Sequence, residues 1–345
     1  MTPLRLLTFL LISLALAACG GGGGGSDTGA GTSTPCTTPI ARGSSNYLMA
    51  FHACDTSTTD CGNPQNHMIY LARSDDGVSW TLLTEFTPRS GSVPDIAVFQ
   101  DYLYIFHAGQ SETWAKLNAC GEAVDSGNAS LSGGSDTAGF VDPSLIVNGS
   151  ELEMFYLPGI MGQDPAQCAG GGTCTKEIHS ATTTGGNPNA LIQQSGYRVQ
   201  QTLNTPPDNL VSFSDPDIVP LDNGSRFLLY VSAGQSVLAY EGTSLDTVFT
   251  IPGGGTSQRL VSNNSGGVAS GLQVTSGDVW LYVTSNQGGK EVIRRGVSSD
   301  GITQIADANF STVVDAAIFG GSASDPINVS SPSVISWDDL ANWAQ

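Results

Sequence analysis

A two-strand pattern that recurs along the chain constrains the fold more than any other feature. Each copy has a short apolar run, a turn and a second run rich in Tyr, Phe and Leu, at 94–109, 142–159, 215–234 and 269–285. Residues 331–335 match one more first run, and residues 46–54 match a second run without its partner. Short apolar runs separated by Gly, Asn and Asp are typical of antiparallel strands. The sequence therefore predicts an all-β fold built from repeated hairpins.

A second motif follows most of these hairpins. Segments 69–80, 237–249 and 292–303 share Ser-x-Asp, and Gly follows the Asp in two of them. Gly accepts positive φ without steric cost, so Asp-Gly predicts a tight turn between a third and a fourth strand. Four strands per unit, repeated every ~45–75 residues, predict a β-propeller. We expect five blades of four antiparallel strands, closed by 331–335 against the N-terminal hairpin. A sandwich or jelly roll is the alternative, but neither explains the repeated order.

The N-terminal segment has the features of an export signal. Arg5 precedes a short apolar stretch, and Leu16-Ala17-Ala18-Cys19 resembles a bacterial lipobox, which implies cleavage before Cys19 and a lipid on its sulfur. An ordinary signal peptide with a chance cysteine is the alternative. We expect a signal peptide at 1–18, a lipidated Gly/Ser/Thr-rich tether at 19–43 and one propeller domain at 44–345. The predicted location is the bacterial cell envelope, at the outer membrane or cell surface.

Six further cysteines predict disulfide bonds. An even number of cysteines in an exported chain favours disulfides over a metal site, and no Cys-x-x-Cys pair is present. Two pairs are close enough in sequence to close single loops, which leaves the third pair by elimination. The expected bonds are Cys54–Cys61, Cys168–Cys174 and Cys36–Cys120.

The charge of the chain limits its partners. Its formal net charge is −19, with only 12 Lys and Arg, so nucleic acid and anionic membrane surfaces are disfavoured and neutral or cationic ligands fit better. No phosphate-binding loop or EF-hand motif is present, so we expect no cofactor and no catalytic metal. A structural ion in the central channel stays open. We expect a monomer that touches membrane only through its anchor.

The blade openings resemble those of glycoside hydrolase family 43 and its levanase and invertase relatives. The resemblance rests on Asp95, Asp142-Pro143 and Asp215-Pro216 at the start of successive blades, on Asn-Gly turns, and on outer turns such as Ser74 to Trp80. It covers the chain from about residue 44 onward and implies a five-bladed propeller. Sialidases are an alternative, but the Ser74 turn is one residue shorter than their Asp-box.

The resemblance implies roles for the aspartates. Asp95 matches the general base and Asp142 the residue that tunes the pKa of the acid, whereas Asp215 stands where the family has a glutamate acid. Inverting hydrolysis needs two carboxyls ~6.5–9.5 Å apart, and Asp is one methylene shorter than Glu. Either Asp215 serves with a repositioned substrate, or a loop supplies the acid, with Glu177 and Glu112 the nearest candidates.

Propeller geometry adds candidates for substrate binding. The start of a first strand, the end of a second and the start of a third share one face of a propeller. Side chains at these positions are His52, His67, His107 and Trp114. Each also has a structural interpretation: a buried, hydrogen-bonded histidine, a packed tryptophan, and for the aspartates a cap on the strand turn.

Two functions remain open from the sequence. The first is a cell-surface glycosidase acting on a neutral polysaccharide such as an arabinan or fructan, favoured by aspartates in three adjacent blades. The second is a non-catalytic propeller that binds glycan or protein, favoured by the missing third-blade glutamate.

Overall fold

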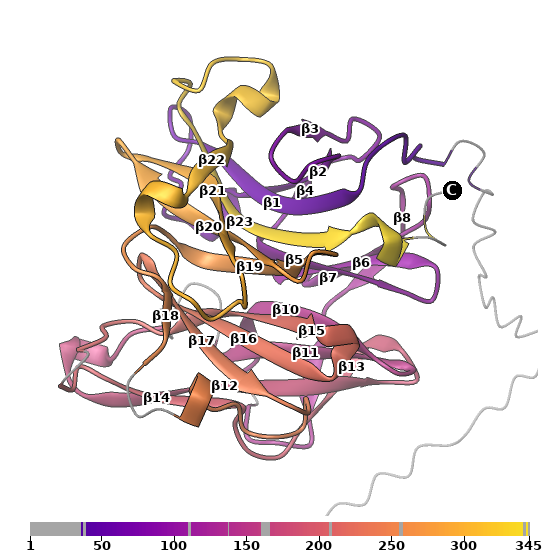
Figure 1. Ribbon diagram of the computed structural model, residues 1–345. Helices are drawn as coiled ribbons and strands as arrows, with labels where there is room; N and C mark the ends of the chain where they lie inside the picture. Colours follow the sequence, from indigo (N-terminus) through magenta and orange to yellow (C-terminus); the bar gives the residue numbers. More distant parts are fainter. Residues whose placement is uncertain are drawn as a thin grey trace, which may run out of the picture. The chain divides into compact units, whose positions relative to one another are not determined.

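The computed structural model describes residues 36, 39–109, 112–136, 138–159, 166–206, 209–254, 258–340 and 343 (Figure 1). The predicted signal peptide and Cys19 lie outside the described residues. Residues 36–345 form one compact unit. Cys36 is disulfide-bonded and Ile40 is buried, so part of the segment assigned to the tether belongs to the folded unit. No helix of the described residues is long and apolar enough to cross a membrane.

Five antiparallel sheets form the five blades of a propeller, as predicted. Blade 1 contains β23 (Ile327–Ser336), β1 (Tyr47–Asp55), β2 (Met68–Ser74) and β3 (Trp80–Leu82), with β4 (Arg89–Ser90) also paired to β2. Blade 2 contains β5 (Ser92–Phe99), β6 (Tyr102–Ala108), β7 (Trp114–Leu117) and β8 (Ala123–Gly127). Blade 3 contains β10 (Phe140–Asn148), β11 (Glu151–Pro158), β12 (Cys174–Thr184) and β13 (Asn187–Gln193), to which β9 (Ser130–Ser132) and β14 (Val199–Leu203) are added.

Blade 4 contains β15 (Ser214–Leu221), β16 (Arg226–Ala233), β17 (Ser236–Gly242) and β18 (Leu260–Ser262). Blade 5 contains β19 (Gly267–Gln273), β20 (Val279–Gln287), β21 (Lys290–Ser298) and β22 (Ser311–Val314). The helices of the described residues are short 3-10 turns, at Pro64–Asn66, Ala169–Gly171, Asp222–Gly224, Pro252–Gly254, Asp307–Asn309, Ala316–Phe319 and Trp337–Leu340.

The innermost strands β23, β5, β10, β15 and β19 gather around the central axis (Figure 1), and each contacts the next. Blade 1 combines both ends of the propeller, because β23 pairs with β1, from Tyr47 opposite Ser336 to Asp55 opposite Ile327. This pairing confirms the predicted closure of the ring.

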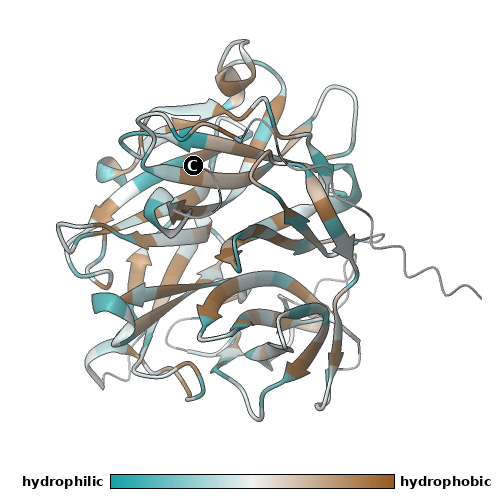
Figure 2. Ribbon diagram, turned by 90° about the vertical axis from the view of Figure 1, so that its right-hand side faces the viewer, coloured by the Kyte–Doolittle hydropathy of each residue, from teal (hydrophilic) through white to brown (hydrophobic). Residues whose placement is uncertain are grey.

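Burial on both faces explains the apolar second strands. Each blade packs against a neighbour on either side, so strands such as β1 and β6 are buried along nearly their whole length. Figure 2 shows hydrophobic stretches running along the strands. The largest buried side chains include Trp114, Tyr156, Tyr230 and Tyr282.

The Ser-x-Asp-Gly turns join neighbouring blades. Asp76 accepts the backbone N–H groups of Val78 and Ser79, both at 2.7 Å. The carbonyl of Gly77 then accepts the hydroxyl of Tyr282 from blade 5 at 2.9 Å. The equivalent carbonyl of Gly301 accepts the Tyr230 hydroxyl from blade 4 at 2.7 Å. Trp80 and Trp280 also pack where blades 1 and 5 meet, and Trp80 lies edge-on against Tyr282.

The predicted disulfides are confirmed. The bonds are Cys36–Cys120, Cys54–Cys61 and Cys168–Cys174.

Candidate functional site

A bulge interrupts every innermost strand at the same position. The residue at the bulge has positive φ in all five blades, and the set is Val93, Asp142, Asp215, Val268 and Ser331, with φ between 45° and 54°. Pro follows it in four blades and Ala in the fifth. Asp142 and Asp215 are therefore equivalent, whereas Asp95 stands two residues after its bulge. All three aspartates lie near the start of an innermost strand, as expected, but Asp95 is offset from the other two because Asp-Pro and Pro-Asp are offset copies of the same turn.

In each blade, the side chain two residues after the bulge takes part in a closed ring of hydrogen bonds around the axis, here called the hydrogen-bond ring. Its members are Asp95, Ser144, Asp217, Ser270 and Ser333. Each side chain accepts the backbone N–H of a residue in a neighbouring blade, at 2.5–3.1 Å, and the donors are Leu145, Ile218, Gly271, Val334 and Ile96. Innermost strands expose an unpaired edge to the channel, so the ring satisfies N–H groups that would otherwise lack partners.

Two members of this hydrogen-bond ring are buried carboxyls. Asp95 and Asp217 are 7% and 8% exposed. Burial raises the pKa of Asp95 to about 6, although hydrogen bonds from Ser333 and Leu145 oppose the rise. Burial and the charge of Asp95 raise the pKa of Asp217 well above its usual value. Because its oxygens are engaged inside the ring, Asp95 is poorly placed to activate water for an external substrate.

Asp142 and Asp215 lie together on adjacent blades. The Asp215 N–H is 3.4 Å from Asp142 Oδ2, and Asp215 Oδ2 accepts the Ser214 hydroxyl at 2.5 Å. Both aspartates are only partly buried. Burial raises the pKa of Asp215 to about 6.

The second strands explain this pairing. In three blades the bulge N–H donates to a side chain on the second strand of the preceding blade: Val93 to His52, Val268 to Ser232 and Ser331 to Thr284. The corresponding residue of blade 3 is Leu157, which has no acceptor, and the Asp215 N–H points to Asp142 instead. The strand register makes Ala108, not His107, the counterpart of His52, so the two Phe-His-Ala segments are not equivalent.

Most of the four side chains predicted to bind substrate instead make contacts within the protein. His52 is buried and stacks on His67 at 4.1 Å, and burial lowers the pKa of His52 well below its usual value. His67 is bonded to Ser92 Oγ and to the Cys61 carbonyl oxygen. His107 is fully buried, and its Nε2 has no partner among the described residues.

Trp114 is also fully buried, with its indole N–H donating to Asn189. The expectation that Trp114 or His107 contacts substrate is therefore wrong, because neither side chain reaches the surface.

The two glutamates predicted as alternative acids are held by other side chains, and Glu177 lies within β12 rather than in a loop as expected. Glu112 forms an ion pair with Arg89 at 2.5 Å. Glu177 accepts from His179 at 3.0 Å and from Gln200, and these hydrogen bonds lower its pKa, opposite to what a general acid requires.

A polar network on blade 3 was missed by sequence reasoning. Asp136 Oδ2 lies 2.5 Å from His179 Nδ1 and accepts from Tyr156 at 2.7 Å and from Gln193 at 2.6 Å. His179 links this network to Glu177. His179 lies near the start of a third strand, on the propeller face where the sequence predicted the site. This position was the signal that could have identified His179 as a candidate.

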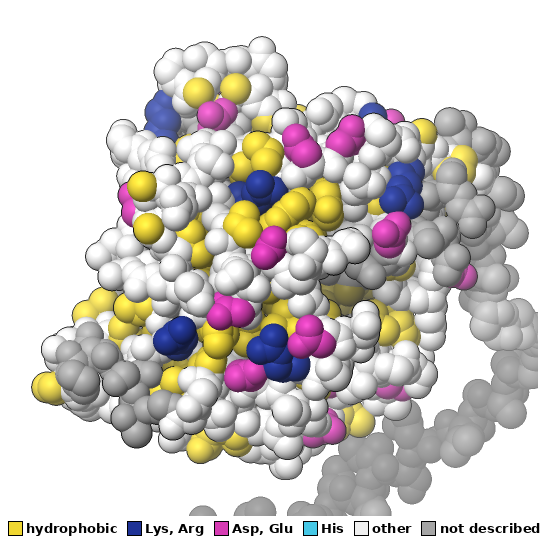
Figure 3. All heavy atoms as spheres, in the orientation of Figure 1, with side chains coloured by type: hydrophobic (Ala, Val, Ile, Leu, Met, Phe, Trp, Pro, Cys, Tyr) yellow, Lys and Arg dark blue, Asp and Glu magenta, His cyan; other side chains and the backbone are white. Residues whose placement is uncertain are grey.

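The channel has unequal ends. At the narrow end, the bulge residues that the structure describes enclose a cavity of about 20 Å³, together with Asp95 and Asp217. On the other side of the hydrogen-bond ring the channel widens to about 750 Å³. Figure 3 shows acidic side chains scattered over one face, with a few basic ones among them.

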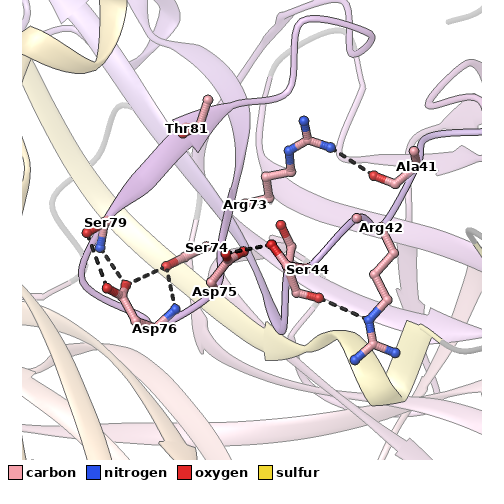
Figure 4. A pocket seen from close by; sticks show the side chains of 11 residues that line it. Ala41, Arg42, Ser44, Arg73, Ser74, Asp75, Asp76, Ser79 and Thr81 are labelled. Carbon is pink, nitrogen blue, oxygen red and sulfur yellow. Dashed lines mark hydrogen bonds between the residues drawn. The ribbon is translucent and has the colours of Figure 1, made fainter.

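A separate hollow of about 600 Å³ lies at the outer edge of blade 1 (Figure 4). Its polar groups bind one another: Asp75 accepts the Ser44 hydroxyl at 2.6 Å, and Arg73 donates to the Ala41 carbonyl. It contains none of the predicted site residues. Across the described residues, no group of three or more His, Cys, Asp or Glu is arranged to hold a metal.

No protein-family model matches the chain, and no curated protein matches it. Similar solved structures include a family 43 glycoside hydrolase from Xanthomonas citri complexed with xylotriose, with TM-score 0.48 and 13% identity over 78% of this chain and 88% of that chain. The family 43 endo-arabinanase from Bacillus licheniformis has TM-score 0.41 and 15% identity over 64% and 76%. A further family 43 protein from that organism has TM-score 0.40 and 11% identity, and the match covers 63% of this chain and 41% of that longer chain. The five-bladed fold itself is established by the sheet topology.

Proposed function

We propose that the propeller binds a neutral glycan at the bulged end of its central channel, where Asp142 and Asp215 accept hydrogen bonds from sugar hydroxyls. The observation that carries the proposal is the contact between two aspartates on adjacent blades, where the Asp215 N–H lies 3.4 Å from Asp142 Oδ2 and both residues are only partly buried. Carboxylates are strong acceptors for hydroxyl donors, and a net charge of −19 disfavours acidic sugars. The motif resemblance to glycoside hydrolase family 43 supplies the ligand class, an arabinan or fructan.

Hydrolysis at the same site is the second candidate. The raised pKa of Asp215, about 6, keeps its carboxyl partly protonated in mildly acidic solution, as a general acid requires. Asp142 would then be the partner carboxylate. If the protein is a hydrolase of this kind, its activity falls as the pH rises through 6.

Calorimetric titration with arabinan and fructan oligosaccharides tests the binding. Asp142→Asn and Asp215→Asn should each weaken binding about tenfold or more, because each loses a charged acceptor. Asp125→Asn, at an exposed position on the outer strand of blade 2, is the matched control and should bind as the native protein does. Unchanged affinity in both site variants would rule out the proposed site. Release of reducing sugar by the native protein but not by Asp215→Asn would establish hydrolysis.

We also propose that a lipid on Cys19 anchors the propeller in the cell envelope. The lipobox-like sequence before Cys19 supports this. Incorporation of labelled palmitate that is lost in Cys19→Ala would establish the anchor, and labelling of that variant would refute it.

A further inference from the structure

The wide end of the central channel is a second cavity, separated from the proposed glycan site by the hydrogen-bond ring. Its volume is about 750 Å³, within the usual range for small-molecule sites. Its walls come from all five innermost strands and include Ile96, Leu145, Ile218 and Val334. Asp95 and Asp217 line both this cavity and the small one beyond it, so these two residues form its floor.

We propose that this cavity binds a linear aliphatic ammonium ion, with the alkyl chain against the apolar walls and the ammonium group on the two floor carboxyls. An ammonium group has three donors and no acceptor, and each carboxylate has about four lone-pair sites. Asp217 accepts bonds from Gly271 and Ser270 in the ring, which leaves sites for a ligand. Asp95 accepts from Leu145, Ser333, Ile96 and Ser144, so it contributes charge rather than further hydrogen bonds.

Charge complementarity selects the cation. Two aspartates line the cavity, and none of the described residues that line it is Lys, Arg or His. Their negative charge is therefore not balanced by a cationic side chain of the cavity wall. An alkyl ammonium supplies the charge and also covers the apolar wall, which an anion or a neutral alcohol does not do.

A metal ion fits less well than an amine. No group of three or more His, Cys, Asp or Glu suited to a metal is present in the described part of the chain. A hydrated ion would also have to lose water against apolar walls, which is costly without a full set of ligands.

Titration calorimetry at pH 8 with 1-hexylamine, 1-hexanol and hexanoate tests the inference. The amine should bind about 10- to 100-fold more tightly than the alcohol of equal length, because it adds charged hydrogen bonds, and hexanoate should not bind. At pH 6, where the Asp95 carboxyl is about half protonated, amine binding should release protons. Equal affinity for amine and alcohol, or tighter binding of calcium than of the amine, would overturn the inference.

Two variants distinguish the contribution of the floor aspartates to binding from that of the apolar walls. Asp217→Asn keeps a carbonyl acceptor for the Gly271 N–H but removes the charge, so amine affinity should fall to that of the alcohol. Asp125→Asn is again the matched control and should bind the amine as before. Val147→Phe enlarges a 42%-exposed wall residue and should weaken amine and alcohol alike without lowering the melting temperature. Unchanged amine affinity in a folded Asp217→Asn, or in Val147→Phe if Asp217→Asn does not fold, refutes the site.

Discussion

Replacing Asp95 by Ser tests the electrostatics of the hydrogen-bond ring. Three of the five ring positions already carry Ser, whose hydroxyl accepts the same kind of backbone N–H. Asp95→Ser therefore retains an acceptor for Leu145 and removes one buried carboxyl.

The size of the effect follows from the pKa of Asp95. The carboxyl titrates near 3.8 in the unfolded chain and near 6 in the folded protein, so the unfolded state loses its proton first as the pH rises. Stability associated with Asp95 is complete below pH 3.8 and is lost as the pH rises through 6. The difference corresponds to about 3 kcal/mol, or a melting shift of about 5 °C for a fold of roughly 300 residues.

Urea unfolding of the native protein and Asp95→Ser between pH 4 and pH 8 measures this difference. The variant should gain stability relative to the native protein as the pH rises, with most of the change complete by pH 7. Asp125→Ser, at an exposed site, should show no such trend. A stability difference between Asp95→Ser and the native protein that stays constant with pH would refute the reasoning, whatever its sign.

Three further predictions concern stability and binding. Trp114→Phe should lower the free energy of unfolding by about 1–3 kcal/mol, by urea titration, and leave glycan affinity unchanged, because the buried indole loses its hydrogen bond but never meets the ligand. Gly301→Ala should cost about 2–4 kcal/mol in the same assay, since φ is +76° and the new methyl would lie 2.5 Å from a Leu228 carbon; a stable variant would contradict this. Removing the Cys36–Cys120 bond, which spans 84 residues, should cost about 4–5 kcal/mol in guanidinium, roughly twice the cost of opening a seven-residue loop.

Periodicity and turn chemistry predicted most of the fold. The alternation of apolar runs with Asp-Gly and Asn-Gly turns was sufficient for the all-β class, the five blades and the closing strand, because these depend on local strand and turn preferences. The disulfides also followed from sequence spacing.

The candidate site was harder to predict, because it depends on register. Positive φ at Val93 and Val268 runs against the preference of β-branched residues, so no local signal marked these bulges as equivalents of Asp142. Without the bulges, Asp95 could not be separated from Asp142 and Asp215. The burial of Trp114 likewise depends on how adjacent blades pack, which a single strand does not reveal.

The closure of blade 1 has a consequence for how the chain acquires its structure. Ser333 of β23 bonds to Asp95 and accepts from Ile96, so the last innermost strand in the sequence completes both the first blade and the hydrogen-bond ring. Every blade depends on its two neighbours, and the final contact joins segments separated by more than 200 residues. Such non-local closure is slow and is made only after the intervening chain is available. A chain emerging in order from its N-terminus therefore lacks this closing contact until β23 is available, and it acquires its full stability in one late step.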